Sequence, residues 1–367
     1  MMMKRRQWVS LLLLCALAAS LLAACGTSQS AAGNGSGSNS SGLEVELVVA
    51  GNGATVEALM KDEIFKKFNA KYPDVKLSYV SGVSTDIVAK VTAQQGAPQI
   101  DLVVIEGGEQ EAGRVKGLWE PLDPSAVPNM SKVDGALAVA ENSGVTVNYT
   151  PMGISYNAKL AQERGLPVPE SWNDLARPEM KGNLTLTEMS SNFGRSATIM
   201  LAYANGGSER EMAPGFEKLK QIAGYMPTFA KTAAQLQQNL QNNTSVYTAW
   251  TMARSIVQKD QGVELEFVIP KEGANIVPNV ASLVKGAKHP KAAAAFIDFL
   301  LTDEVQTLYA TKLYYNTAVD VQLPEETAKL LDFDKSLIVP FDYGTISDNT
   351  KQWLDTFNKE VAPLVGK

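Results

Sequence analysis

Two residue types that build most catalytic and metal sites are nearly missing from this 367-residue chain. It has two cysteines, Cys15 and Cys25, and one histidine, His289. Zinc sites made of His and Cys, redox Cys-x-x-Cys motifs and Cys–His dyads all need more of them. His289 lies in a Pro-flanked loop, GAKHPKAA, typical of a solvated residue, and no GxSxG motif is present for a serine triad. We therefore expect no enzyme, no cofactor, no bound metal and no disulfide.

Positive charge is also scarce. The chain has 33 basic and 39 acidic side chains, and three of the basic ones, Lys4, Arg5 and Arg6, stand at the N-terminus. Without these three the balance is 30 against 39, a net charge of about −9. Such an acidic surface repels phosphate groups, so neither nucleic acid nor an anionic lipid surface is expected as a partner. Hydrolysis by paired carboxylates remains open, although no motif supports it.

The N-terminus has the layout of a secretory signal peptide over residues 1–24. The three basic residues precede the apolar run VSLLLLCALAASLLAA, which is short for a membrane span. Leu22-Ala23-Ala24-Cys25 resembles the bacterial lipobox, in which the cysteine becomes the lipidated first residue of the mature chain. The alternative is an ordinary signal peptide with an incidental cysteine. We expect lipidation at Cys25 and attachment to the outer face of the cytoplasmic membrane by this anchor only.

A linker without charged, aromatic or branched aliphatic residues follows the cysteine. Residues 26–42 read GTSQSAAGNGSGSNSSG, too polar to bury the apolar surface that would offset their ordering entropy. We expect residues 25–42 to act as a flexible tether. Such a tether suits a body that must reach a membrane partner.

The remaining residues, 43–367, predict an α/β fold in two lobes, because this length exceeds what one core usually holds. Strands are expected at 43–50, 75–80 and 100–105, alternating with helices at 59–72 and 84–96. Extended segments near 145–157 and 265–285 indicate that the chain leaves the first lobe and returns. The predicted lobes are 43–148 with about 275–318, and 149–274 with about 319–367. Paired connecting strands would form a hinge that closes over a ligand.

In the second lobe, Ser171 and Asp174 form a capping-box pattern, and NLTLT (183–187) predicts a strand. Helices are expected at 193–205, 208–226, 232–242 and 250–259, with a strand at 245–249. Two more helices are expected at 290–301 and after Ser347.

Two stretches resemble the signature of bacterial extracellular solute-binding proteins of the iron, polyamine and thiamine type. The first stretch contains Gly153-Ile154, Tyr156-Asn157, Gly165, Pro169, Ser171-Trp172, Asp174-Leu175 and Lys181-Gly182. The second contains Pro270-Lys271-Glu272-Gly273, a strand at 280–284 and an Ala- and Phe-rich helix at 292–300. The resemblance covers nearly all of 43–320. It implies a type II periplasmic-binding-protein fold and a monomer that hands a small solute to an ABC permease and ATPase.

Ligands of open α/β sheets bind beyond the carboxyl ends of the strands, which nominates two loops of the first lobe. Asn52, Gly53 and Thr55 follow the first strand, where a plain tight turn is an equal alternative. Glu106 and Gly107 follow the third strand, where Glu106 and Glu109 could hold a cation or be solvated.

Two further elements complete the predicted site. Glu188, Ser190, Ser191, Asn192 and Arg195 surround a helix start, and together they could bind an anion. A helix cap with a surface arginine is the alternative. Trp250, expected at the start of the 250–259 helix, matches a position where polyamine-binding relatives place an aromatic ring against the solute. A buried core tryptophan is the rival interpretation.

The charge of the solute stays open at this point. The adjacent tyrosines that the resemblance would require near Trp250 for ferric iron are absent, and the pair Tyr314-Tyr315 lies elsewhere in the chain. Polyamine-binding relatives carry acidic residues where this chain has Asn192 and Ala281. We therefore favour a small anion such as a phosphonate, organophosphate or carboxylate over a polyamine-like cation. A solute sensor that feeds a two-component kinase is the alternative function.

Overall fold

A computed structural model describes residues 45–367. The predicted signal peptide, Cys25 and the tether lie outside the described residues. Within 45–367, no helix combines the length and the apolar character needed to cross a bilayer.

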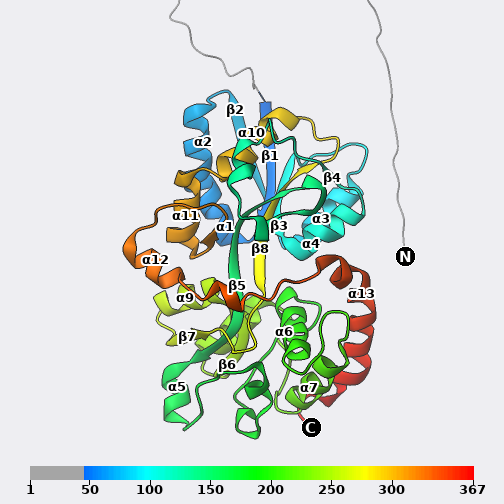
Figure 1. Cartoon of the computed structure of the whole chain (residues 1–367), viewed down its shortest axis with the longest axis vertical. Helices are drawn as coiled ribbons and strands as arrows, with labels where there is room; N and C mark the ends of the chain where they lie inside the picture. Colours follow the sequence, from blue (N-terminus) through cyan, green and yellow to red (C-terminus); the bar gives the residue numbers. More distant parts are fainter. Residues whose placement is uncertain (1–44) are drawn as a thin grey trace, which may run out of the picture. The chain divides into compact units, whose positions relative to one another are not determined.

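The first sheet begins with three parallel strands, in the order β2-β1-β3. The predicted strand–helix alternation is confirmed, with ends shifted by a few residues (Figure 1). Strand β3 is fully buried except at its last residue, which explains its continuous apolar sequence. The elements of this part are β1 Val45–Asn52, α1 Ala54–Leu59, α2 Phe65–Lys71, β2 Val75–Gly82, α3 Ser84–Ala93, β3 Leu102–Glu106, α4 Gly107–Val115 and β4 Trp119–Glu120.

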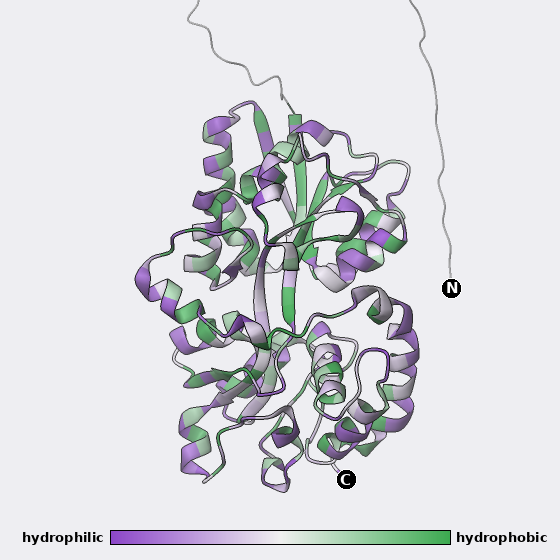
Figure 2. Cartoon of the chain, in the orientation of Figure 1, coloured by the Kyte–Doolittle hydropathy of each residue, from purple (hydrophilic) through white to green (hydrophobic). Residues whose placement is uncertain are grey.

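Strand β8, Ile276–Val284, returns to this sheet and pairs antiparallel with β3. Two helices follow it, α10 Pro290–Leu300 and α11 Asp303–Leu313, and then the short strand β9, Asn316–Thr317. Apolar side chains of α2, α10 and α11 pack on one another and on the sheet to form the first core. Figure 2 shows apolar residues concentrated along the strands and polar residues on the outer helix faces.

Strand β5, Val145–Asn157, links this sheet to the rest of the fold, and all thirteen of its residues are buried. Its first half pairs with β8. Its second half pairs with β6, Tyr247–Thr251, and with β7, Leu265–Val268. The two long strands β5 and β8 therefore run between the two parts of the molecule, as predicted for a two-lobed fold (Figure 1).

A second core gathers side chains of most of the remaining helices, with Trp172, Tyr247 and Trp250 fully buried in it. Met252, Ile256 and Leu331 pack with Ala310 in a separate, smaller cluster. The C-terminal helix α13 contributes Ile346 and Trp353 to this core. The exact boundaries between lobes remain a prediction. The helices of this part are α5 Ala158–Glu163, α6 Asn192–Tyr203, α7 Ala213–Ala223, α8 Ala233–Gln241, α9 Met252–Asp260, α12 Glu325–Leu331 and α13 Tyr343–Thr356.

The two signature stretches, about 100 residues apart in sequence, meet in this second part. Ser171 caps the 3-10 helix Trp172–Ala176 in the predicted capping box with Asp174. The carboxylate of Glu272 accepts hydrogen bonds from the Ser171 hydroxyl and the Trp172 backbone N–H. The indole of Trp172 donates to the Gly273 carbonyl at 2.9 Å. Ser171 and Trp172 are buried and Glu272 is half-buried, so the two stretches satisfy one another's hydrogen bonds away from most of the solvent.

Two predictions about local structure are wrong. Residues 183–187 form isolated bridges, Leu184 with Tyr247 and Thr187 with Ala230, and not a continuous strand. Trp250 lies in strand β6, and α9 begins two residues later at Met252. In both cases pairing with residues distant in sequence decides the backbone conformation. Local sequence propensity cannot predict such pairing.

Candidate functional site

A cleft of about 540 Å³ opens where the carboxyl ends of β1 and β3 face the starts of α6 and α9. This volume suits a small organic solute. Eight of the eleven predicted ligand-binding residues line the cleft: Asn52, Gly53, Thr55, Glu106, Ser190, Ser191, Asn192 and Trp250. Gly107, Glu188 and Arg195 are not among the lining residues.

The loops of the first sheet are fixed to one another by Ser84, at the start of α3. Its hydroxyl donates to Oδ1 of Asn52 at 2.7 Å and accepts from the backbone N–H of Glu106 at 3.2 Å. One side chain thus aligns the ends of β1 and β3. Gly53 has a φ of +52°, a backbone conformation that favours glycine, and nothing lies within 4 Å of where its Cβ would be. The turn is therefore open toward the cleft.

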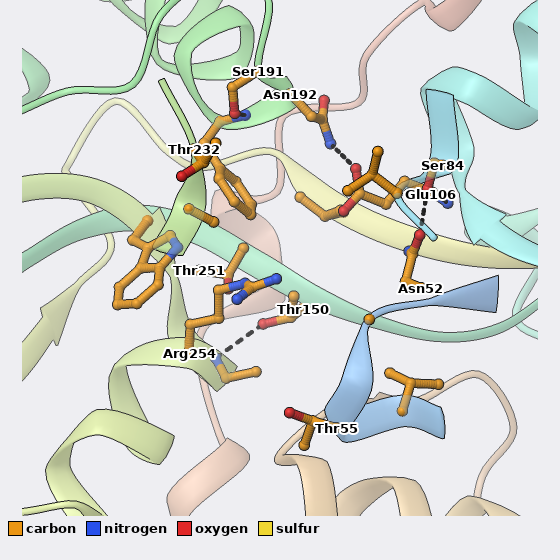
Figure 3. A pocket seen from close by; sticks show the side chains of 18 of the residues that line it. Asn52, Thr55, Ser84, Glu106, Thr150, Ser191, Asn192, Thr232, Thr251 and Arg254 are labelled. Carbon is orange, nitrogen blue, oxygen red and sulfur yellow. Dashed lines mark hydrogen bonds between the residues drawn. The ribbon is translucent and has the colours of Figure 1, made fainter. Parts of the chain in front are cut away.

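At the opposite wall, α6 begins with a hydroxyl cap. Ser191 accepts a hydrogen bond from the backbone N–H of Phe193 at 3.3 Å. Asn192, in the first turn, donates from Nδ2 to Oε2 of Glu106 at 3.1 Å (Figure 3). The predicted helix cap is present, and its polar side chains face the cleft beside Glu106.

Arg195 does not enter the cleft. Only 7% of the residue is exposed, and its guanidinium donates to Oε1 of Glu109 at 3.1 Å. Because that charge is already satisfied by a carboxylate, Arg195 holds α6 against α4. Gly107 begins α4 against Pro278, and Glu188 lies just before the α6 cap. Arg195 and Gly107 thus pack behind the lining of the cleft.

The sequence prediction missed Arg254, the most distinctive cation of the cleft. It lies in the first turn of α9, and Figure 3 shows its side chain extending into the pocket. Its guanidinium carbon is 5.4 Å from the centre of the Phe193 ring and 5.8 Å from that of Trp250. Among residues 45–367, no carboxylate forms an ion pair with it. Its place in the first turn of a helix that follows a strand made it a candidate, but Arg195 also stands in the first turn of a helix, and the sequence does not rank the two.

Trp250 both lines the cleft and belongs to the second core, with 0% of its surface exposed. Its indole Nε1 is buried without a hydrogen-bond partner in the described chain. Trp250 is therefore a buried core tryptophan, the rival interpretation from sequence, and its ring packs beside Arg254. Contact between this ring and a solute stays a prediction. An aromatic face stabilises a cation near it while leaving the hydrogen-bond donors of the cation available.

Among the acids that line the cleft, Glu106 has a pKa that departs strongly from its ordinary value. Burial, and next the negative charge of Glu109, raise its pKa to about 7, although Arg254, the Asn192 amide and Arg195 act in the opposite direction. Glu109 keeps one oxygen, Oε2, buried without a partner in the described part of the chain. The carboxylates of Glu106 and Glu109 therefore have fewer hydrogen-bond donors nearby than their oxygens could accept.

Tyr315 also lines the cleft, although its position in the sequence gave no reason to expect it there. Burial raises the pKa of its hydroxyl. Its neighbour Tyr314 has a φ of +56° and its hydroxyl bonds to Asp260. The two adjacent tyrosines thus point to different surroundings.

Comparison with known proteins identifies the family. Residues 63–335 match the family described as "Bacterial extracellular solute-binding protein". The chain belongs to this family. The match covers about three quarters of the sequence, and the predicted type II binding-protein fold is confirmed by solved structures.

Three similar proteins illustrate the range of the family. A spermidine/putrescine-binding periplasmic protein of Salmonella typhimurium is 26% identical, over 73% of this chain and 77% of its own. A Salmonella typhi protein provisionally described as a 2-aminoethylphosphonate-binding periplasmic protein is 23% identical, over 65% of this chain and 68% of its own. The periplasmic binding protein AfuA of Actinobacillus pleuropneumoniae, solved with fructose-6-phosphate, has a TM-score of 0.72 and 22% identity, covering 87% of this chain and 99% of its own.

These similarities define the general role of the protein. It is an extracellular solute-binding protein, and the curated relatives named above are described as periplasmic binding proteins.

Proposed function

We propose that this solute-binding protein captures a small organic phosphate or phosphonate in the cleft and delivers it to the permease of its importer. The observation that carries the proposal is Arg254. It is a guanidinium in a solute-sized cleft, held between aromatic rings and without a carboxylate partner in the described chain. An arginine in this state keeps its donors for a ligand, and its planar fork matches a phosphate or phosphonate group.

Helix starts around the cleft add to the preference for an anion. Ser84 and Thr85 begin α3, and Ser191 caps α6. The unpaired backbone N–H groups and the positive dipole at such ends favour negative charge. Lys231, on the loop before α8, supplies a second cation to the lining. The anionic end of the solute would therefore lie between Arg254 and Ser191.

A polyamine-like cation is the second candidate, favoured by the similarity to spermidine/putrescine-binding proteins and by Glu106. The charges of the cleft oppose it. Glu109 is paired with Arg195, which leaves Glu106 as the one unpaired acid to balance Arg254. A diamine needs carboxylates in excess over cations, and this cleft does not supply them.

The proposal includes the membrane anchor. Lipidation at Cys25 would hold the receptor on the outer face of the membrane, and the Ser/Gly linker to residue 42 would let the body reach solute and then the permease.

A thermal-shift screen tests the solute class. Organic phosphates, phosphonates, carboxylates and polyamines are added to the purified protein and to its Arg254→Gln variant. A ligand at 100-fold over its Kd stabilises the folded state by about 2.7 kcal/mol, a readily measured change in melting temperature. We expect a phosphate or phosphonate to raise the melting temperature of the wild type. The same ligand should leave the melting temperature of Arg254→Gln unchanged.

The matched control is Arg210→Gln, which removes an exposed arginine paired with Asp342 outside the cleft. It should respond to the solute as the wild type does. Stabilisation by a polyamine and by no anion would refute the proposal in favour of the second candidate.

A further inference from the structure

We infer that Glu106 determines the charge state in which the cleft accepts its anion: the anion is bound together with one proton, which is held by Glu106. This inference rests on the proposed anionic solute. In it, Glu106 is protonated and donates a hydrogen bond to the anion, whereas a cation would require its charged carboxylate.

The position of the carboxylate is the first support. Glu106 ends β3 at the cleft, and its Oε2 accepts from Asn192 in the first turn of α6. The carboxylate is therefore adjacent to the helix end at which we place the anion (Figure 3). Among the described residues, no hydrogen bond reaches its other oxygen, Oε1, so a protonated Glu106 can donate from there to a solute oxygen.

The count of charges is the second support. Without solute, the carboxylates of Glu106 and Glu109 balance the guanidinium groups of Arg195 and Arg254, and the exposed Lys231 of the lining adds one positive charge. A doubly charged anion adds two negative charges to this partly buried cluster. Because like charges at short range in a poorly hydrated site disfavour each other, the cluster gains by taking up a proton.

The hydrogen-bond inventory decides which group takes the proton. Glu109 already accepts an ion-pair hydrogen bond from the guanidinium of Arg195. Glu106 has a neutral amide as its direct partner and already binds a proton more readily than an ordinary glutamic acid. The charged and titratable groups around Glu106 are Glu109 on α4, Arg195 on α6, Arg254 on α9, Tyr315 before β9 and Tyr343 on α13.

Inorganic sulfate is the probe for this inference, because it stays doubly charged from about pH 5.5 to about pH 8.5 and cannot bring a proton itself. Its Kd is measured calorimetrically across this range for the wild type and for Glu106→Gln. In the wild type we expect Kd to rise about tenfold per pH unit above pH 7, with one proton taken up per sulfate. The proton uptake is read from the difference between buffers of unequal ionisation enthalpy.

The Glu106→Gln amide is always uncharged and can donate a hydrogen bond, so its Kd should not change with pH and no proton should be taken up. Glu46→Gln, which removes an exposed carboxylate at the start of β1, should keep the pH dependence of the wild type.

The failures of the two proposals are distinguishable. Sulfate binding that is independent of pH in the wild type, or equally pH-dependent in Glu106→Gln, would overturn the role of Glu106 and leave the anion site intact. Absence of sulfate binding at every pH would overturn the inferred proton-coupled site. If the organic phosphates and phosphonates of the thermal-shift screen also fail to stabilise the protein, the proposed function falls as well.

Discussion

Arg195 on α6 and Glu109 on α4 form an ion pair across the two parts of the fold, with 3.1 Å between Nη2 and Oε1. Their side chains are only 9% and 11% exposed. The hydrogen bond from Asn192 to Glu106 joins the same two helix starts. These contacts join the second core to the first beside the cleft, in addition to the connecting strands.

Breaking this buried pair should be costly. Arg195→Gln leaves Glu109 buried without its cation, and we expect the free energy of unfolding to fall by about 3–5 kcal/mol. The exposed pair of Arg210 and Asp342 is the control, since Arg210→Gln should cost about 1 kcal/mol or less. Urea unfolding of both variants measures the difference. Equal losses would show that the Arg195–Glu109 pair contributes no more than a surface ion pair.

The raised pKa of Glu106 predicts a pH dependence of stability without any solute. The unfolded chain titrates this group near 4.5 and the folded protein near 7. Between these values the folded state binds more protons, so the contribution of Glu106 is full below about pH 4.5 and is lost as the pH rises through 7. The loss is at most about 3 kcal/mol.

Glu106→Gln cannot titrate and should not show this loss. Unfolding free energies at about pH 5 and about pH 8 should therefore differ less in the variant than in the wild type. An identical change in both proteins would mean that Glu106 titrates normally in the folded state.

Trp250 should report on the cleft by its fluorescence, because it supports Arg254 and lines the pocket. A bound solute should change the emission of the wild type, and Trp250→Phe should lose that change while remaining folded. Trp353→Phe, which alters a tryptophan of α13 outside the lining residues, should keep it. Trp250→Ala is unsuitable, since emptying a buried tryptophan site costs about 3–5 kcal/mol. If the fluorescence change on solute binding persists in Trp250→Phe, another tryptophan produces it and the prediction is wrong.

The proposed lipid anchor predicts that loss of Cys25 changes the location of the protein without changing its fold. Cys25→Ser should block incorporation of labelled palmitate, and the protein should no longer sediment with membranes after expression in a bacterial host. Its thermal stability should match that of the wild type, because the body begins beyond the linker. Membrane attachment that persists in Cys25→Ser would refute the lipid anchor.

Much of the cleft could be predicted from the sequence because it follows from strand order. Ligands of α/β sheets meet strand ends, and Asn52 and Glu106 follow strands whose apolar runs are unmistakable. Ser191 could be predicted in the same way, since a hydroxyl before an apolar helix is a cap wherever that helix packs.

Other residues could not be assigned because their roles depend on partners far away in the chain. Arg195 and Arg254 both stand in the first turn of a helix, and the sequence gives no reason to treat them differently. The fold turns Arg195 toward Glu109, 86 residues away, and leaves Arg254 in the cleft.

The sequence by itself determined the type of chain: an α/β solute-binding protein whose strand ends carry polar loops. The tertiary structure decided which charges remain for a solute. The physical reason is that helix periodicity fixes only which face a side chain occupies. Whether that face meets a carboxylate, an aromatic ring or the open cleft depends on how the lobes pack.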